Sequence, residues 1–235
     1  MLIESKMLQW NKKGIFVLTF QERSSKSKLN LRIERYHLHG VGVRFQRAIN
    51  TSGEFEPGLP DTLVIHFTAG SNLASSVDVL TSPENKVSAH FAVGRNGDIV
   101  QMMPTNLIAW HAGRSNYMGR SGYNRYSIGI ELDNAGQLEK RDDGVFKSWF
   151  GKSYSANEVV TAVHRNQQTP THWHKYTDEQ LLRTFDLCKV LIEHHTITTI
   201  VGHDEIAPKR KVDPGPAFPL DEFRAALLGG ATTNL

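Results

Sequence analysis

Two short apolar runs, each interrupted by one polar residue, place the strongest constraint on the fold of this chain. Residues 62–67 (TLVIHF) and 127–132 (SIGIEL) are almost continuously apolar. Such runs are typical of strands that are buried on both faces of a sheet. A strand buried in this way needs other elements above and below it, so the two runs predict a layered domain.

The segments between and after these runs add helices and a hairpin. Asn96-Gly97 accepts the positive φ angles of a tight turn and predicts a hairpin between two short strands. Helical patterns cover residues 72–80 and 221–228, and a longer helix begins at Thr177, which forms a capping-box pattern with Gln180. Strands mixed with helices give a mixed α/β fold class.

The pattern divides the chain into a main domain with additions. We expect residues 1–60 to form an N-terminal β extension packed on the main domain, which spans 61–228. Residues 135–176 are polar, aromatic and irregular, and we interpret them as an insertion with a short helix at 157–164. The segment 229–235 is expected to be a C-terminal tail.

Composition excludes several classes of protein. One cysteine cannot form an internal disulfide, nor can it build a zinc site on several thiolates. A formal net charge of +3 is too weak to indicate nucleic acid as a partner. The longest early apolar run, residues 14–20, falls well short of the roughly 20 residues of a membrane span and lacks a cleavage site. We therefore expect a cytoplasmic location, with release by lysis or another export route left open, and we infer no obligate protein partner.

Polar residues interrupt the strands at three places where a core does not favour them. His66 lies in the first apolar run, Glu131 lies in the second, and His203 ends a short β-like run at residues 197–201. Two imidazoles and a carboxylate can hold one zinc ion, and Asp213, ten residues after His203, is the candidate carboxylate. Glu131 could then transfer protons, and Lys211 could stabilise a developing oxyanion.

Each of these residues also has a plain structural explanation. A histidine in a strand is more often a hydrogen-bonded core residue than a ligand, and Lys211 alone is typical of a solvated surface charge. Glu131 is harder to explain in this way, because a carboxylate in an apolar strand costs several kcal/mol unless it is partnered. The sequence contains no G-x-S-x-G, Walker or G-x-G-x-x-G motif, so serine hydrolases, kinases and dinucleotide-binding proteins are disfavoured.

Five ordered motifs together resemble the zinc-dependent N-acetylmuramoyl-L-alanine amidases of the AmpD type, a superfamily that includes the peptidoglycan recognition proteins. The motifs are VIHFTAG (64–70), VSAHFAVGRNGDIVQMMP (87–104), AWHAG (109–113), NRYSIGIELDN (124–134) and GHDEIAPKRKVDPGPAF (202–218). The resemblance implies a central mixed β-sheet flanked by helices, with one zinc ion in a surface cleft. It also implies hydrolysis of the amide between N-acetylmuramic acid and L-alanine, in peptidoglycan or its muropeptide fragments.

The resemblance assigns a role to each matching residue. It makes His66, His203 and Asp213 the zinc ligands, Glu131 the catalytic carboxylate and Lys211 the lysine that stabilises the transition state. It places Trp110, His111 and Arg210 at the substrate.

Two other functions remain open at this point. The chain could be a recognition protein that binds muropeptides without cutting them, although such proteins typically lack a zinc ligand and this chain has all three. It could also be a zinc hydrolase of a different amide. Recycled anhydro-muropeptides and intact cell wall are both open as substrates.

Overall fold

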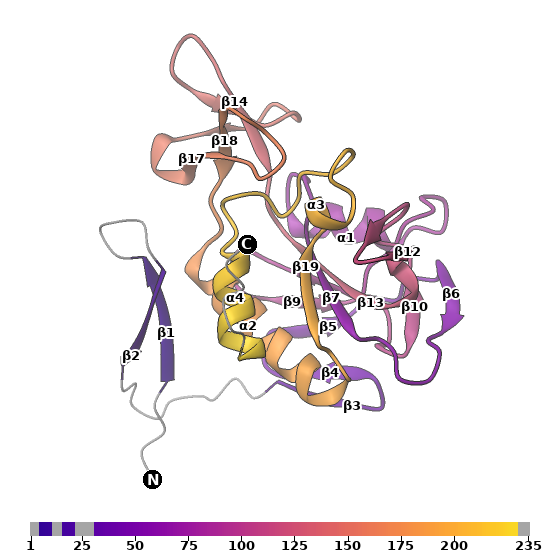
Figure 1. Cartoon of the computed structure of the whole chain (residues 1–235). Coiled ribbons are helices and arrows are strands. Elements are labelled where there is room, and N and C mark those ends of the chain that lie inside the picture. The colour runs from indigo at the N-terminus through magenta and orange to yellow at the C-terminus, as the bar shows by residue number, and fades with distance from the viewer. Residues whose placement is uncertain (1–4, 11–15, 22–30, 230–235) are drawn as a thin grey trace.

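A six-stranded mixed sheet lies at the centre of the fold, in a computed structural model that describes residues 5–10, 16–21 and 31–229 (Figure 1). Its strands, in spatial order, are β19 (Thr199–Gly202), β7 (Thr62–Phe67), β13 (Ser127–Leu132), β8 (Phe91–Val93), β9 (Ile99–Gln101) and β5 (Val43–Phe45). The first four strands run parallel to one another, β9 is antiparallel to β8, and β5 is parallel to β9. The predicted fold class, a central mixed sheet flanked by helices, is confirmed.

The two apolar runs form the central strands β7 and β13. All six residues of β13 are buried, and in β7 only Phe67 is partly exposed. β8 and β9 form the predicted hairpin, in which Gly97 adopts the left-handed φ of 83° that the turn requires. The prediction of strands buried on both faces is therefore confirmed.

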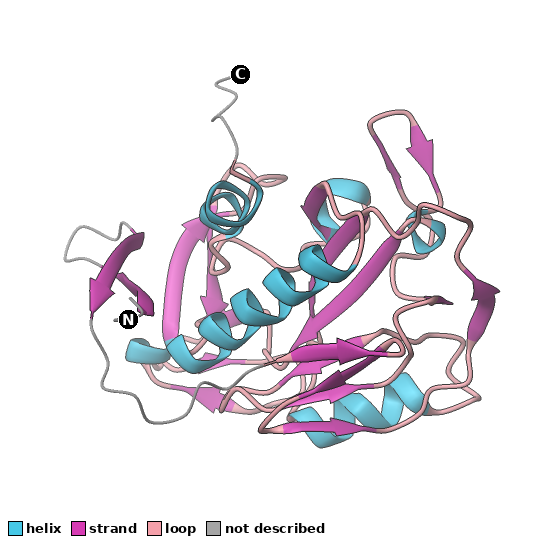
Figure 2. Cartoon of the chain, turned by 90° about the horizontal axis from the view of Figure 1, so that it is seen from below, coloured by secondary structure: helices cyan, strands magenta, loops and turns pink. Residues whose placement is uncertain are grey.

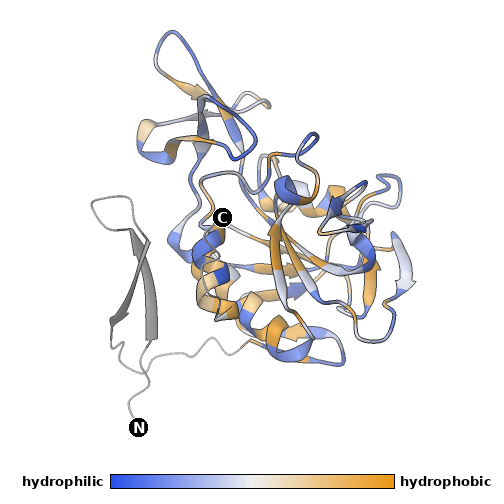
Figure 3. Ribbon diagram, viewed as in Figure 1, coloured by the Kyte–Doolittle hydropathy of each residue, from blue (hydrophilic) through white to orange (hydrophobic). Residues whose placement is uncertain are grey.

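Helices cover the central sheet on both faces (Figure 2). They are α1 (Leu73–Thr81), α2 (Asp178–His194), α3 (His203–Ile206) and α4 (Leu220–Leu228). Alternate strand residues face opposite layers: in β8, Phe91 shares a core cluster with Leu187 of α2 and Phe223 of α4, whereas Ala92 lies in a cluster with Val77 of α1. Hydrophobic residues accordingly concentrate on the central strands and on the helix faces that meet them (Figure 3).

Only half of the predicted capping box forms at the start of α2. The Thr177 hydroxyl oxygen accepts a hydrogen bond from the Gln180 backbone N–H at 3.1 Å, as expected for an N-cap residue. The Gln180 side chain does not return to the cap. It donates instead to the carbonyl oxygens of Val93 and Asp133, at 2.9 and 3.2 Å, and so ties the helix to the sheet.

Thr177→Ala is expected to lower the free energy of unfolding by about 1 kcal/mol, because it removes the side-chain acceptor at the helix N-terminus. Chemical denaturation measures the change. The matched control is Thr169→Ala, since Thr169 is exposed and lies outside helices and strands. Equal stability of the two variants would contradict the capping role.

The insertion forms a second, five-stranded sheet, which stands at the top of Figure 1. Its strands, in spatial order, are β16 (Ser153–Tyr154), β15 (Phe146–Lys147), β14 (Gln137–Lys140), β18 (Pro170–His174) and β17 (Val159–Val163). The predicted helix at 157–164 is wrong, because only the 3-10 turn η2 (Ala156–Glu158) precedes β17. The valines of β17 favour an extended strand, which pairs along its whole length with β18.

The first sixty residues contribute β structure in several places. β1 (Ser5–Trp10) pairs with β2 (Phe16–Gln21), and β3 (Arg32–Glu34) pairs with β4 (His37–His39). β5 joins the central sheet beside β9, and β6 (Thr51–Glu54) pairs with β10 (Leu107–Ala109). The division into an extension and a main domain stays a prediction, and the tail beyond Gly229 lies outside the described residues.

The remaining short elements join β10 to β13. They are β11 (Asn116–Tyr117), β12 (Arg120–Ser121) and the 3-10 turn η1 (Tyr123–Arg125). Across the described parts of the chain, no helix has the length and apolar character needed to cross a membrane.

Candidate metal centre

The candidate site lies at the carboxyl ends of three neighbouring parallel strands. His66 and Glu131 are register partners near the ends of β7 and β13, so their side chains leave the same face of the sheet. Gly202 of β19 is the register partner of Ile65, so the next residue, His203, emerges beside His66. The carboxyl edge of parallel strands is where open α/β sheets usually bind ligands.

Three side-chain atoms converge at this edge to form a small triangle. His66 Nδ1 lies 2.9 Å from His203 Nδ1, and Asp213 Oδ2 lies 3.0 Å from the first nitrogen and 2.9 Å from the second. All three residues are buried. The Asp204 backbone N–H donates to the Asp213 carbonyl oxygen at 2.7 Å, which folds the loop after α3 back onto His203.

The contact of His203 with a backbone carbonyl fixes the position of its proton. His203 Nε2 lies 3.0 Å from the carbonyl oxygen of Ala112, which can only accept a hydrogen bond. Nε2 therefore carries the proton and donates it. In the neutral ring, Nδ1 then points a lone pair into the triangle.

A chain of hydrogen bonds fixes the tautomer of His66 in the same way. His111 Nε2 lies 3.2 Å from the carbonyl oxygen of Ser127 and must donate to it, so His111 Nδ1 is an acceptor. His66 Nε2 lies 3.0 Å from that nitrogen and donates to it. Burial, with nearby His203, lowers the pKa of His66 to about 4, so its ring is neutral and its Nδ1 also points a lone pair into the triangle.

The donor set fits a divalent cation. Two imidazole nitrogens and one carboxylate oxygen meet at close range, and a shared cation can bind all three. Two histidines and one carboxylate are a ligand set that zinc uses in sites with an open fourth position. The single cysteine, Cys188, lies on α2, where it is buried in the core cluster, and is absent from this group.

Glu131 is a buried carboxylate beside the triangle. Burial, with the nearby charge of Asp213, raises its pKa to about 8, and the charge of Lys211 partly opposes the shift. Its Oε2 atom has no hydrogen-bond partner among the described residues. A carboxyl group held in this state can exchange a proton near neutral pH.

These residues open into a cleft of about 570 Å³. Its lining includes the triangle, Glu131, Lys211, Trp110 and His111. Trp110 is half-buried and its indole N–H donates to the Ser52 hydroxyl at 2.8 Å. Seven of the eight site residues predicted from the sequence therefore lie in one cleft.

Arg210 is the exception, because it does not line the cleft. Its guanidinium donates to the carbonyl oxygens of Ala112 and Arg114, at 2.8 and 2.9 Å. The Ala112 carbonyl oxygen also accepts a hydrogen bond from His203. Arg210 therefore supports the segment 112–114, which contacts the candidate ligand His203. Its contact with substrate stays a prediction.

Sequence reasoning missed two contributions of the insertion. Trp149 and Phe150 line the cleft, although no local pattern connects them with residues some eighty positions earlier.

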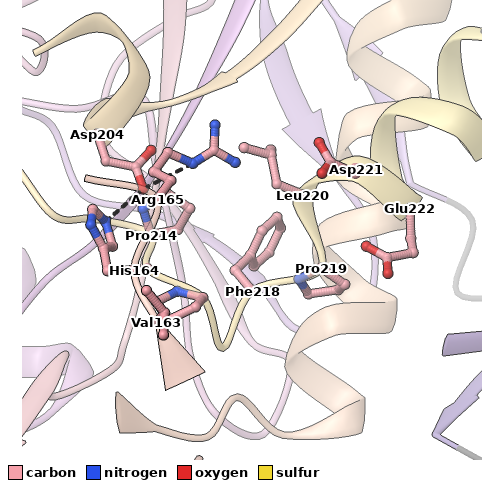
Figure 4. Close-up of a pocket in the computed structure, with 12 residues that line it drawn as sticks. Val163, His164, Arg165, Asp204, Pro214, Phe218, Pro219, Leu220, Asp221 and Glu222 are labelled. Atoms are coloured by element: carbon pink, nitrogen blue, oxygen red, sulfur yellow. Dashed lines mark hydrogen bonds and ion pairs between the residues drawn. The ribbon is translucent and has the colours of Figure 1, made fainter. Parts of the chain in front are cut away.

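His164 lies in a separate pocket of about 300 Å³, where its Nε2 lies 3.0 Å from Asp204 Oδ2 (Figure 4). Burial raises the pKa of Asp204 to about 7. The one signal in the sequence was the cluster of aromatic residues in an otherwise polar segment.

Comparison with known proteins adds a family and several relatives. Residues 56–216 match the family described as N-acetylmuramoyl-L-alanine amidase. The chain is 35% identical over 142 residues to the 1,6-anhydro-N-acetylmuramyl-L-alanine amidase AmpD of Salmonella typhimurium, covering 60% of this chain and 57% of the relative. It is 32% identical over 176 residues to the N-acetylmuramoyl-L-alanine amidase AmiD of Escherichia coli, covering 71% and 53%. The chain thus spans little more than half the length of these relatives.

Solved structures with the same fold include proteins of the same names. A crystal structure of an AmpD derivative superposes with a TM-score of 0.58 at 27% identity, covering 83% of this chain and 98% of that one. AmiD from Escherichia coli, solved with the substrate anhydro-N-acetylmuramic acid-L-Ala-D-γ-Glu-L-Lys, gives a TM-score of 0.54 at 29% identity, covering 86% and 66%.

Proposed function

The chain belongs to the N-acetylmuramoyl-L-alanine amidase family, and from this premise we propose that it hydrolyses the amide between the lactyl group of N-acetylmuramic acid and L-alanine. The substrate is peptidoglycan or its muropeptide fragments. The observation that carries the proposal is the convergence of His66, His203 and Asp213 in one cleft with the buried Glu131, all within the matched residues.

His66, His203 and Asp213 would hold one zinc ion. When bound, zinc supplies a Lewis acid for the substrate carbonyl and makes a water molecule more acidic. The buried histidines contribute ring nitrogens that already face the triangle, and hydrogen bonds at their other nitrogens orient the rings, so the ligands need little rearrangement.

Glu131 moves the proton in the proposed mechanism. Its carboxylate takes a proton from the attacking water and returns it to the leaving amine of L-alanine. The positive charge of Lys211, in the same cleft, stabilises negative charge on the carbonyl oxygen as the bond to water forms. Trp110 borders the cleft and is proposed to contact the substrate.

Digestion of defined muropeptides, followed by mass spectrometry, tests the proposal. We expect release of free stem peptide by the zinc-loaded protein and loss of that release after treatment with a chelator. Binding without cleavage by a zinc-loaded sample would favour a recognition protein instead. Cleavage of other amides in preference to the muramoyl amide would favour a hydrolase of different specificity.

His111→Ala is expected to weaken zinc affinity about 10–100-fold, which is typical when the hydrogen-bond partner of a ligand is lost. The reason is that His111 Nδ1 accepts the proton of His66 Nε2 and so fixes the tautomer that directs Nδ1 at the metal. Competition with a chromophoric chelator measures the affinity. His111→Asn, which can keep an acceptor near Nδ1, should recover part of it.

The control for this prediction is His194→Ala, because His194 is exposed at the end of α2. Folding of each variant is checked by circular dichroism. Zinc affinity that is unchanged in a folded His111→Ala protein would contradict the positioning role.

A further inference from the structure

The insertion presents an exposed tryptophan at the mouth of the cleft. Trp149 lies in the turn between β15 and β16, and 78% of it is exposed. It lines the same cleft as the candidate metal centre. An exposed tryptophan beside a site is a notable exception to the usual burial of large aromatic residues.

Two sets of contacts hold Trp149 in this position. Its indole N–H donates to the carbonyl oxygen of Ala69 at 2.7 Å, three residues beyond His66, and its ring meets Phe150 edge-on at 5.6 Å. The turn is closed by a hydrogen bond from the Gly151 N–H to the Ser148 carbonyl oxygen at 2.9 Å. The polar edge of the indole is therefore occupied, and its exposed surface is available to a ligand at small entropic cost.

The surroundings of Trp149 suit an uncharged ligand with both apolar and hydroxyl groups. The side chains of Val79 and Val87, 51% and 38% exposed, add apolar surface to the cleft, and Ser71 and Ser75 add hydroxyl groups. The carboxylate and ammonium groups in the lining belong to Glu131, Lys211 and Asp213, which form the candidate active site. A sugar ring has a flat face of C–H groups and hydroxyls at its edge, whereas the stem peptide carries carboxylates.

We propose that Trp149 is a stacking platform for a sugar ring on the muramoyl side of the scissile amide, and that it makes the enzyme prefer substrates that retain their carbohydrate. The inference rests on the proposed amidase function. It assigns the insertion a role in substrate selection. Trp149 would contact the sugar ring and would not contact the atoms of the scissile amide.

A pair of matched substrates tests the platform. N-acetylmuramoyl-L-alanyl-D-isoglutamine and D-lactoyl-L-alanyl-D-isoglutamine share the scissile amide and the peptide, but only the first has a sugar ring. Trp149→Ala is expected to lower kcat/KM about tenfold or more for the first, as truncation of a central aromatic contact typically does, and to leave the second unchanged. Trp149→Phe keeps a flat ring and should retain most of the activity. Equal loss on both substrates, or no loss on either, would overturn the proposal.

A binding measurement separates this proposal from the proposed function. The peptide-free disaccharide of N-acetylglucosamine and N-acetylmuramic acid is titrated into the full chain by calorimetry, and Trp149→Ala should weaken its binding about tenfold. Met118→Ala is the control, because Met118 is 80% exposed and does not line the cleft. If neither amide substrate is cleaved, the amidase proposal fails, yet the titration still decides on the sugar platform. No binding by the unmodified chain, or equal binding by Trp149→Ala, rejects the platform.

Discussion

Glu131→Gln is expected to lower kcat for muropeptide hydrolysis by roughly 10²–10⁴-fold, the usual contribution of a positioned general acid or base. Glutamine has nearly the same shape as glutamate but cannot accept and return the proton of the attacking water. Because Glu131 lies in the fully buried strand β13, a substitution that conserves shape is the one that tests chemistry without disturbing the core. Mass spectrometry of the released stem peptide measures the rate.

Zinc content provides the internal control for this variant. Glu131 is outside the group of converging ligand atoms, so Glu131→Gln should bind as much zinc as the unmodified chain. Glu139→Gln is a matched control, since Glu139 lies in β14 and is exposed. A Glu131→Gln protein that holds zinc and retains full kcat would refute the proposed proton transfer.

Asp213→Ala is expected to weaken zinc binding by more than the roughly 10–100-fold that loss of a ligand's hydrogen-bond partner costs, and to abolish hydrolysis with it. Asp213 Oδ2 is the one anionic atom of the triangle, at 3.0 and 2.9 Å from the two histidine nitrogens. Without it, two imidazoles remain, and two ligands do not hold zinc in the three-ligand arrangement of known hydrolase sites. Metal analysis after gel filtration measures the retained zinc.

Asp142→Ala is the control for Asp213→Ala, because Asp142 is exposed in the insertion and should leave zinc content unchanged. Added zinc offers a second test: a weakened site should recover some activity at high zinc concentration. Normal zinc retention by a folded Asp213→Ala protein would show that Asp213 is not a ligand.

The central part of the fold was predictable because its signals are local. The apolar runs of β7 and β13 and the Asn96-Gly97 turn each specify a structure within a few residues. The polar residues His66 and Glu131 indicated the candidate site for a related reason. Burying a polar group in an apolar strand costs free energy unless the group has a partner.

The insertion was not predictable because two of its strands are very short and its contacts are distant. β15 and β16 have two residues each, too few for a detectable alternation. The hydrogen bond from Trp149 to Ala69 joins residues eighty positions apart, and no periodicity encodes it. The helix expected at 157–164 was wrong because the β-branched residues of β17 favour a strand, which pairs with β18.

The contacts between the insertion and residues 203–215, which carry His203 and Asp213, limit how this protein could be re-engineered. His164, directly after β17, forms a hydrogen bond with Asp204, the residue after His203. Trp173 of β18 lies so close to Gly215 that a methyl group on that glycine would come within 2.8 Å of the ring. Residues 135–176 therefore cannot be trimmed or grafted as an independent cassette. A chimaera that receives this segment would have to receive Asp204 and Gly215 as well, and a deletion would leave the buried carboxylate of Asp204 without its imidazole.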